Sequence, residues 1–163
     1  MTRFLLVLLI IGLIGLSYLG MWRAWQRRVA SQSTLPEPRP LTGTAAVAGP
    51  WQGRYIGAAH AGRWLDRVDA HDLGTRSTVA VCVTATGVDL VREGARSFGV
   101  PFAELAGVRA DTAIAGRAYE DGGLVVLTVR LGATPVDIGI RFPDTDDHLA
   151  ALAAIAHHSE VAP

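Results

Sequence analysis

One uncharged run of apolar residues, Phe4 to Met21, dominates the hydropathy of the chain, and its only polar side chains are Ser17 and Tyr18. A helix of this length rises about 27 Å, close to the roughly 30 Å hydrocarbon core of a bilayer. The other apolar runs are shorter and are interrupted by charged or turn-forming residues. The pattern predicts one N-terminal transmembrane helix with a single water-facing body attached to it.

The flank of this run favours a retained anchor over a cleaved signal peptide. A signal peptide has an apolar core of about 7 to 15 residues followed by a small-residue cleavage site, whereas this longer core leads directly into Trp22, Arg23, Trp25, Arg27 and Arg28. Positive charge near a span stays on the cytoplasmic side, and tryptophan prefers the membrane interface. We therefore expect a single-pass protein of the cell membrane, with these five residues at the inner interface, the N-terminus outside and the C-terminal domain in the cytoplasm.

Residues 29–50 form the next segment, which is rich in proline, alanine and glycine and has no hydrophobic period. Closely spaced prolines favour the extended polyproline II conformation, which acts as a semi-rigid spacer. The chain is therefore predicted to consist of an anchor with its basic flank (1–28), a tether (29–50) and one folded domain (51–163).

The folded domain shows short alternating runs separated by turn residues, which is the pattern of an antiparallel β-domain. The predicted strands cover residues 52–57, 78–84, 88–92, 97–102, 114–119, 124–131 and 135–142. Residues 58–75 are predicted as a long loop or, alternatively, as a partly extended strand through Trp64 to Val68. Residues 103–108 are predicted as a short turn. The domain is therefore expected to contain about seven strands.

In residues 135–142, every second residue is apolar, whereas Asp137, Gly139 and Arg141 alternate with these positions. A period of two is typical of a half-buried strand. We therefore expect this strand to bury one face and to turn the other, with Asp137, Gly139 and Arg141, towards solvent.

A C-terminal helix of about 14 residues is predicted after the last strand. Asp144 or Thr145 would cap its N-terminus, where carboxylates are favoured by the helix dipole. Leu149, Leu152 and Ile155 recur at helical spacing. This stripe is predicted to pack against the sheet.

Five segments of the domain carry a family resemblance: GRYIG at 53–57, AGRWLDRV at 61–68, VPFAELAGVR at 100–109, GGLVVLTVRLG at 122–132 and VDIGIRF at 136–142. With the final hairpin and closing helix, they resemble actinobacterial single-pass membrane proteins that carry a bacterial pleckstrin-homology-like (PH-like) domain. The resemblance implies a mainly β barrel or sandwich of two antiparallel sheets with one C-terminal α-helix. The resemblance carries fold and location rather than activity, and a binding or scaffolding role is our own hypothesis for the domain.

Charge and motifs exclude several function classes. From Trp51 onwards there are ten arginines and fourteen acidic residues, a net charge of about −4, which disfavours nucleic acid as a partner. The single Cys82 lies in an apolar run and is predicted to be a buried, inert thiol. The adjacent His157 and His158 point about 100° apart on a helix, which argues against a metal pair. We therefore predict no metal, no cofactor and, in the absence of a catalytic motif, no enzymatic activity.

The remaining candidate site is Arg63, Trp64 and Arg67. A lipid-binding PH domain needs unpaired basic residues in this region, but here aspartates accompany the arginines. Inositol-phosphate binding is therefore disfavoured. Trp64 is interpreted either as a core residue, which we favour, or as an exposed contact residue. The three residues are assigned to partner binding. The leading hypothesis is a membrane-anchored module that binds another protein, and the alternative is an accessory subunit of a membrane transporter or export system.

Overall fold

The computed structural model describes residues 10–23 and 35–161, which belong to two separate compact units, Met1–Thr34 and Leu35–Pro163. In the first unit, residues 10–23 form a helix with exposed side chains. Residues 4–9 of the predicted span, and Trp25, Arg27 and Arg28 of its flank, lie outside the described residues. Within the described ranges, no helix is both long enough and apolar enough to cross a membrane.

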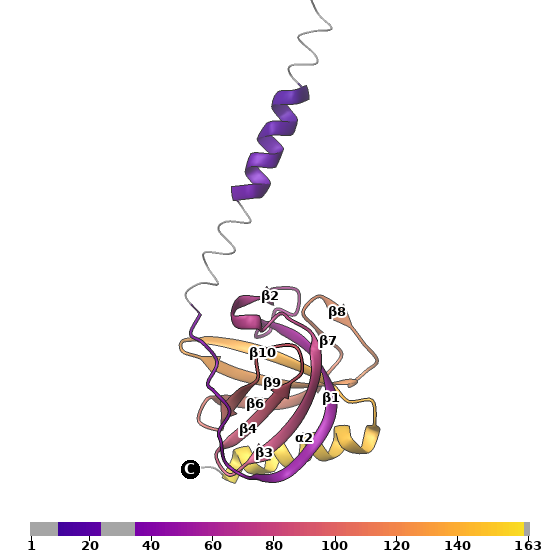
Figure 1. The fold of residues 1–163 in the computed structure, drawn as a ribbon. Helices are drawn as coiled ribbons and strands as arrows, with labels where there is room; N and C mark the ends of the chain where they lie inside the picture. Colours follow the sequence, from indigo (N-terminus) through magenta and orange to yellow (C-terminus); the bar gives the residue numbers. More distant parts are fainter. Residues whose placement is uncertain (1–9, 24–34, 162–163) are drawn as a thin grey trace, which may run out of the picture. The chain divides into compact units, whose positions relative to one another are not determined.

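The second unit contains ten strands, one short 3-10 helix and one α-helix within its described residues (Figure 1). The elements are β1 (Ala46–His60), β2 (Arg67–Val68), η1 (Ala70–Asp72), β3 (Ser77–Thr84), β4 (Gly87–Arg92), β5 (Phe98–Pro101), β6 (Leu105–Asp111), β7 (Ala113–Ile114), β8 (Arg117–Ala118), β9 (Leu124–Leu131), β10 (Thr134–Arg141) and α2 (Thr145–Val161).

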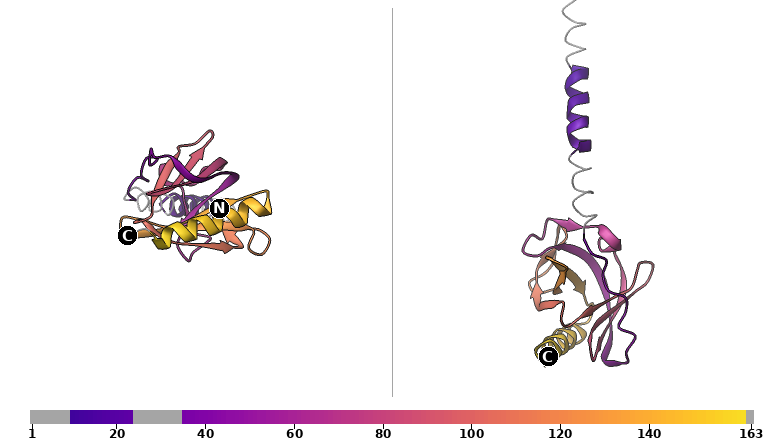
Figure 2. Two further views of the ribbon diagram at one scale, coloured as in Figure 1. Left: turned by 90° about the horizontal axis from the view of Figure 1, so that it is seen from below. Right: turned by 90° about the vertical axis from the view of Figure 1, so that its left-hand side faces the viewer.

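Seven strands follow one antiparallel path in the order β5-β4-β3-β1-β10-β9-β6, β2 pairs with β1 beside this path, and β7 and β8 form a separate hairpin. The sheet bends over on itself to form a sandwich, and α2 packs across one end (Figures 1 and 2). The strands β5 and β6 at the two ends of the path do not pair with each other, so the barrel alternative is wrong. The predictions of a mainly β domain with about seven principal antiparallel strands and a C-terminal helix are confirmed.

The strand β1 links the two halves of the sandwich. Its first part pairs with β3, from Ala46 to Tyr55, and its second part pairs with β10, from Arg54 to His60. The register with β10 shifts between Tyr55 and Gly57. The first strand is therefore much longer than the predicted 52–57. It begins inside the predicted tether because β3 supplies a pairing partner along its whole first part.

Residues 35–42, here called the N-terminal strap, also belong to the folded unit rather than to a free tether. Leu35 is 6% exposed and contributes to the main core. The strap pairs with the edge of β5 through a bridge from Arg39 to Gly99, in which Gly99 N–H donates to Arg39 O at 2.9 Å. Thr42 N–H donates to Asp89 Oδ1 at 2.9 Å. These contacts place the start of the domain at Leu35, sixteen residues before the predicted boundary.

The last strand, β10, is buried on both faces, which corrects the prediction of a half-buried strand. Asp137 is 5% exposed, and a Cβ atom built on Gly139 would meet Ile114 Cγ2 at 2.5 Å. The β7–β8 hairpin lies against the face that was expected to contact solvent, where Ile114 joins a second apolar cluster with Ile56 and Val126. Glycine at position 139 allows this close approach.

The helix α2 is capped as predicted, since Asp144 Oδ1 accepts N–H bonds from Asp146 at 2.7 Å and from Asp147 at 3.3 Å. Its predicted stripe is confirmed at Ile155 and at Leu152, which packs against the core, but not at Leu149. Ala151 and Ile155 are fully buried, whereas Leu149 is 57% exposed. Alanine at the contact lets the helix lie close to the sandwich, which turns Leu149 outwards.

Two further predictions are wrong. Residues 103–108, predicted as a turn, include the start of β6, because β9 provides a ladder from Leu105 onwards. Cys82 is half-buried rather than buried, because it lies on the face of β3 opposite the core residues Val81 and Val83. Partial burial raises the pKa of the Cys82 thiol, and the carboxylate of Asp89 raises it further. The thiol is therefore less readily ionised than a free cysteine.

Candidate functional site

The tip of the loop between β1 and β2 presents apolar and basic side chains to solvent. Trp64 is 44% exposed, Leu65 is 68% exposed, and the side chain of Arg63 is 68% exposed. We call Arg63, Trp64 and Leu65 the Trp64 surface. Large apolar side chains exposed together are uncommon in monomeric proteins and mark interaction sites. The interpretation of Trp64 as a core residue is therefore wrong, and its side chain is exposed as the alternative required.

The backbone of this tip is held in place by hydrogen bonds to two other parts of the domain and by one across the base of its own loop. Trp64 O accepts from Gly116 N–H of the β7–β8 turn at 2.9 Å, and Gly62 N–H donates to Asp137 Oδ2 at 3.3 Å. His60 N–H donates to Asp66 O at 2.9 Å across the base of the loop. The Trp64 surface is thus presented on an ordered loop, which lowers the entropy that a partner must remove on binding.

Arg67, the third predicted site residue, has a different environment. Its Nε atom lies 2.6 Å from Asp69 Oδ1, and its guanidinium also donates to Gly74 O. The contact with Gly74 connects β2 to the segment after η1, whereas Asp69 directly precedes η1. The structure therefore brings Arg63 and Trp64 together at the tip and assigns Arg67 to the base of the loop.

A hollow of about 130 Å³ lies beside Trp64. Ala59, Ala113 and Ile114 line it with apolar groups, and Arg109 and Asp137 are among its polar lining. In a surface depression of this size, an apolar side chain of a partner can be accommodated next to the indole.

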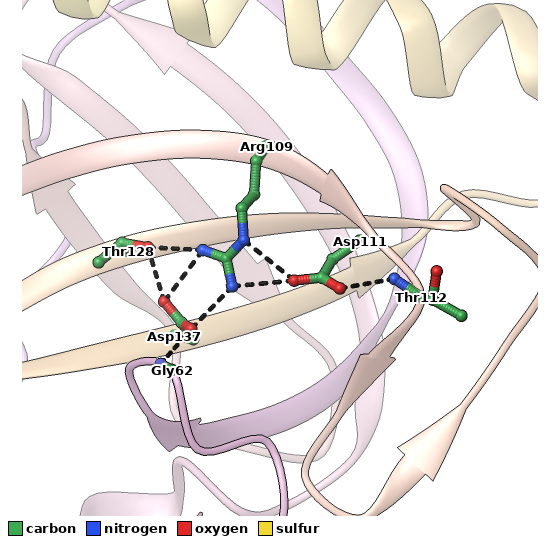
Figure 3. A network of polar contacts seen from close by, with 6 residues as sticks. All are labelled: Gly62, Arg109, Asp111, Thr112, Thr128 and Asp137. Carbon is green, nitrogen blue, oxygen red and sulfur yellow. Dashed lines mark hydrogen bonds and ion pairs between the residues drawn. The ribbon is translucent and has the colours of Figure 1, made fainter.

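The polar side of the hollow is an ion-pair network that joins three strands (Figure 3). Arg109 on β6 donates to Asp137 on β10, with Nη2 to Oδ2 at 2.8 Å and Nη1 to Oδ1 at 3.3 Å. Thr128 on β9 donates to Asp137 Oδ1 at 2.6 Å, and Asp111 accepts from Arg109 Nε at 3.0 Å. The network positions the loop tip through Gly62.

The network lowers the pKa of the Asp137 carboxyl. Burial by itself raises this pKa, but hydrogen bonds from Arg109 and Thr128, with the positive charge of Arg109, outweigh burial. The pKa of Arg109 is raised, chiefly by its hydrogen bond to Asp137. Both groups are therefore charged at neutral pH. Within the described residues, no group of three or more His, Cys, Asp or Glu could hold a metal ion.

A pH dependence of stability follows from the depressed pKa of Asp137. Because the folded-state pKa lies below the ordinary value of 3.8, the carboxylate contributes stability that is fully present above that value and is lost as the pH falls through the folded-state pKa. We expect Asp137→Asn to lower the melting temperature at pH 7 and to have a smaller effect at about pH 3. Thermal denaturation of both proteins across this range measures the difference. An equal deficit at every pH would contradict the assignment.

Sequence reasoning missed Leu65 and the network of Arg109, Asp111, Thr128 and Asp137. Leu65 is adjacent to Trp64 in the sequence, so the apolar pair itself was a usable signal. The network joins residues from three strands, and no local spacing indicates that they meet.

The sequence profile of the bacterial PH domain-like family matches residues 24–156. The chain belongs to this family. The matched range covers most of the chain, including every strand and most of α2. Membership of the bacterial PH domain-like family agrees with the sandwich closed by one C-terminal helix, and it suggests a binding or scaffolding module. No curated protein matches the sequence.

Proposed function

We propose that this chain is a single-pass membrane protein whose PH-like domain lies in the cytoplasm and binds another protein through the Trp64 surface. The observation that carries the binding role is the exposure of Trp64 and Leu65 on a loop fixed by hydrogen bonds. Tryptophan and arginine are over-represented among the residues that dominate binding energy at protein interfaces. No comparable reason favours a catalytic role.

Membrane anchoring is supported by the composition and exposure of the N-terminal helix. The run from Phe4 to Met21 has no charged side chain, and large apolar side chains within residues 10–23, such as Ile14 and Leu16, are 64% and 73% exposed. Apolar surface of this extent is stable in lipid and unfavourable in water. The arginines after the run support a cytoplasmic domain. A protease-accessibility assay on membrane vesicles, which reports the side that holds the C-terminus, tests this topology.

Trp64→Ala is expected to reduce partner binding at least tenfold, with little change in the melting temperature. Removing a central aromatic anchor costs about 2 kcal/mol or more at an interface, whereas a side chain that is 44% exposed contributes less to folding than a buried one. The measurement is photo-crosslinking from an unnatural amino acid at Leu65 in native membranes, with mass spectrometry of the product.

Leu149→Ala is the matched control, because Leu149 is 57% exposed and lies on α2 at the opposite end of the domain from the loop (Figure 1). It should leave the crosslink unchanged. If the crosslinked protein is soluble, the result supports the scaffolding hypothesis. If it is a polytopic membrane protein, the result supports the alternative, an accessory subunit of a transporter or export system. If no product forms, or if Trp64→Ala leaves its yield unchanged, the proposed binding surface is wrong.

A further inference from the structure

The fold brings a second arginine next to the Trp64 surface from a distant part of the sequence. Gly116 in the β7–β8 turn donates its N–H to Trp64 O at 2.9 Å. Arg117 follows Gly116 directly and is exposed. Arg63 precedes Trp64, and its side chain is 68% exposed. The loop tip and the hairpin that contacts it therefore each present one arginine to solvent.

The two arginines differ in their partners. Arg63 Nη1 lies 3.4 Å from Asp66 Oδ2, a pair at the surface of the domain. Such pairs contribute little to stability, so a carboxylate of a partner can approach Arg63 at little cost to the fold. The guanidinium of Arg117 has no hydrogen bond or ion pair within residues 10–23 and 35–161. Its charge is therefore available to a partner.

The aspartates around the neighbouring hollow are already paired (Figure 3). Asp137 is 5% exposed and accepts two hydrogen bonds from Arg109. Asp111 accepts from Arg109 Nε at 3.0 Å and from Thr112 N–H at 2.7 Å. The unpaired charge beside the hollow is therefore the positive charge of Arg117, although the folded domain as a whole has an excess of acidic residues.

The hollow accommodates one side chain rather than a whole small molecule. Its volume is about 130 Å³, whereas sites for small organic ligands usually measure about 300 to 1,000 Å³. Its apolar walls come from Ala59, Ala113 and Ile114. The polar groups of Arg109 and Asp137 that complete the lining bond to each other. An apolar side chain therefore fits there without removing the hydrogen bond between Arg109 and Asp137.

The β7–β8 hairpin places the hollow and the unpaired charge close together. Ile114 lines the hollow and is the cross-strand neighbour of Arg117. The Cβ atoms of such neighbours lie about 4.5 to 5.5 Å apart. Residues of an extended chain advance by about 3.3 Å each. A carboxylate one or two positions away from an apolar side chain in the hollow can therefore reach Arg117.

We propose that the partner protein presents a short segment whose apolar side chain fills the hollow and whose acidic residue, within two positions, pairs with Arg117. This inference rests on the proposed function, because it specifies which kind of segment the Trp64 surface binds. Arg63 can pair with a second carboxylate beside the indole. Arg117 is thus a specificity-determining residue outside the set that the sequence indicated.

The charges favour an acidic protein segment over an anionic lipid surface. A bilayer would spread negative charge over the whole end of the domain, including Asp66 at the loop tip. The acidic excess of the folded domain opposes such an approach. A protein segment places one or two carboxylates only where the arginines lie. Arg63 and Arg117 therefore suit a protein partner better.

The test uses the full chain in detergent and a phage-displayed library of random linear dodecapeptides as the probe. Selected peptides should share an apolar residue with Asp or Glu within two positions of it. A synthetic copy of one such peptide should bind Arg117→Glu at least tenfold more weakly than the unmodified chain, because the substitution brings like charges together. Arg117→Lys keeps the positive charge and should bind within about threefold.

Two controls separate local pairing from a change in net charge. Arg130→Glu makes the same charge change at another exposed arginine, which lines a different hollow with Pro36 and Glu37 of the strap. It should bind the peptide within about twofold of the unmodified chain. A peptide whose acidic residue is replaced by arginine should bind Arg117→Glu more tightly than it binds the unmodified chain. Melting temperatures verify that the variants fold.

Several results would overturn the proposal. These are failure to select any peptide, selected peptides without the acidic residue, equal losses of binding with Arg117→Glu and Arg130→Glu, and no gain from the reversed peptide. If the crosslinker at Leu65 reacts with lipid and with no protein, the surface belongs to the bilayer, and the proposed function is wrong as well.

The two proposals otherwise fail in different ways. If Trp64→Ala abolishes the membrane crosslink and Arg117→Glu does not change it, the binding surface stands and the acidic segment is wrong. If neither substitution changes the crosslink, both proposals are wrong.

Discussion

Replacing Arg109 with methionine is expected to lower the free energy of unfolding by about 3 kcal/mol, because it leaves the carboxylate of Asp137 buried without its counter-ion. Asp137 is 5% exposed and would keep only Thr128 and Gly62 as donors. Breaking a fully buried pair costs about 3 to 5 kcal/mol. The side chain of Arg109 is 43% exposed, which places the expected effect at the lower end. Denaturation of the full chain with guanidinium chloride gives the value.

The matched control is Arg39→Met. Arg39 Nε lies 2.8 Å from Glu104 Oε1, but the Arg39 side chain is 65% exposed. Exposed ion pairs contribute about 0 to 1 kcal/mol, so this variant should unfold close to the unmodified chain. Equal effects of the two substitutions would show that the Arg109 network contributes no more than a surface ion pair.

The second large loss of stability is expected from a substitution in the N-terminal strap. Leu35→Ala should lower the free energy of unfolding by about 2 to 3 kcal/mol, since truncating a buried leucine loses apolar contacts and leaves a cavity. Leu35 is 6% exposed, and its carbonyl oxygen lies 2.8 Å from His71 Nε2. Chemical denaturation of the full chain measures the difference.

Leu41→Ala tests whether this effect belongs to burial rather than to the segment as a whole. Leu41 lies in the same strap but is 38% exposed, so its truncation should change the unfolding free energy by about 0.5 kcal/mol or less. If Leu35→Ala is equally mild, residues 35–42 behave as the tether that the sequence predicted.

The sequence predicted the elements whose signals are local. Alternating residues and intervening turns predict the hairpins β3–β4 and β9–β10. The acidic residues that begin at Asp144 predict the helix cap. These features depend on neighbours within a few residues. The same reasoning predicted the order and the type of most secondary-structure elements of the domain.

Features that depend on distant partners were not predictable in this way. The prolines of the strap predict a spacer, yet Leu35 and Arg39 are fixed by contacts with η1 and β5. The spacing of Leu149 predicts a buried position, but the helix contacts the sandwich through Ala151 and Ile155 and leaves Leu149 exposed. The exposure of Trp64 depends on the β7–β8 hairpin, which contacts its loop from more than fifty residues away.

The shared strand β1 has a consequence for how the domain folds. Its ladder with β10 joins residues about eighty positions apart, while its ladder with β3 joins residues much nearer in the chain. Neither half of the sandwich has a complete set of partners without β1. Unfolding should therefore be a single cooperative transition, and the long loop closure should make folding slow for a domain of this size.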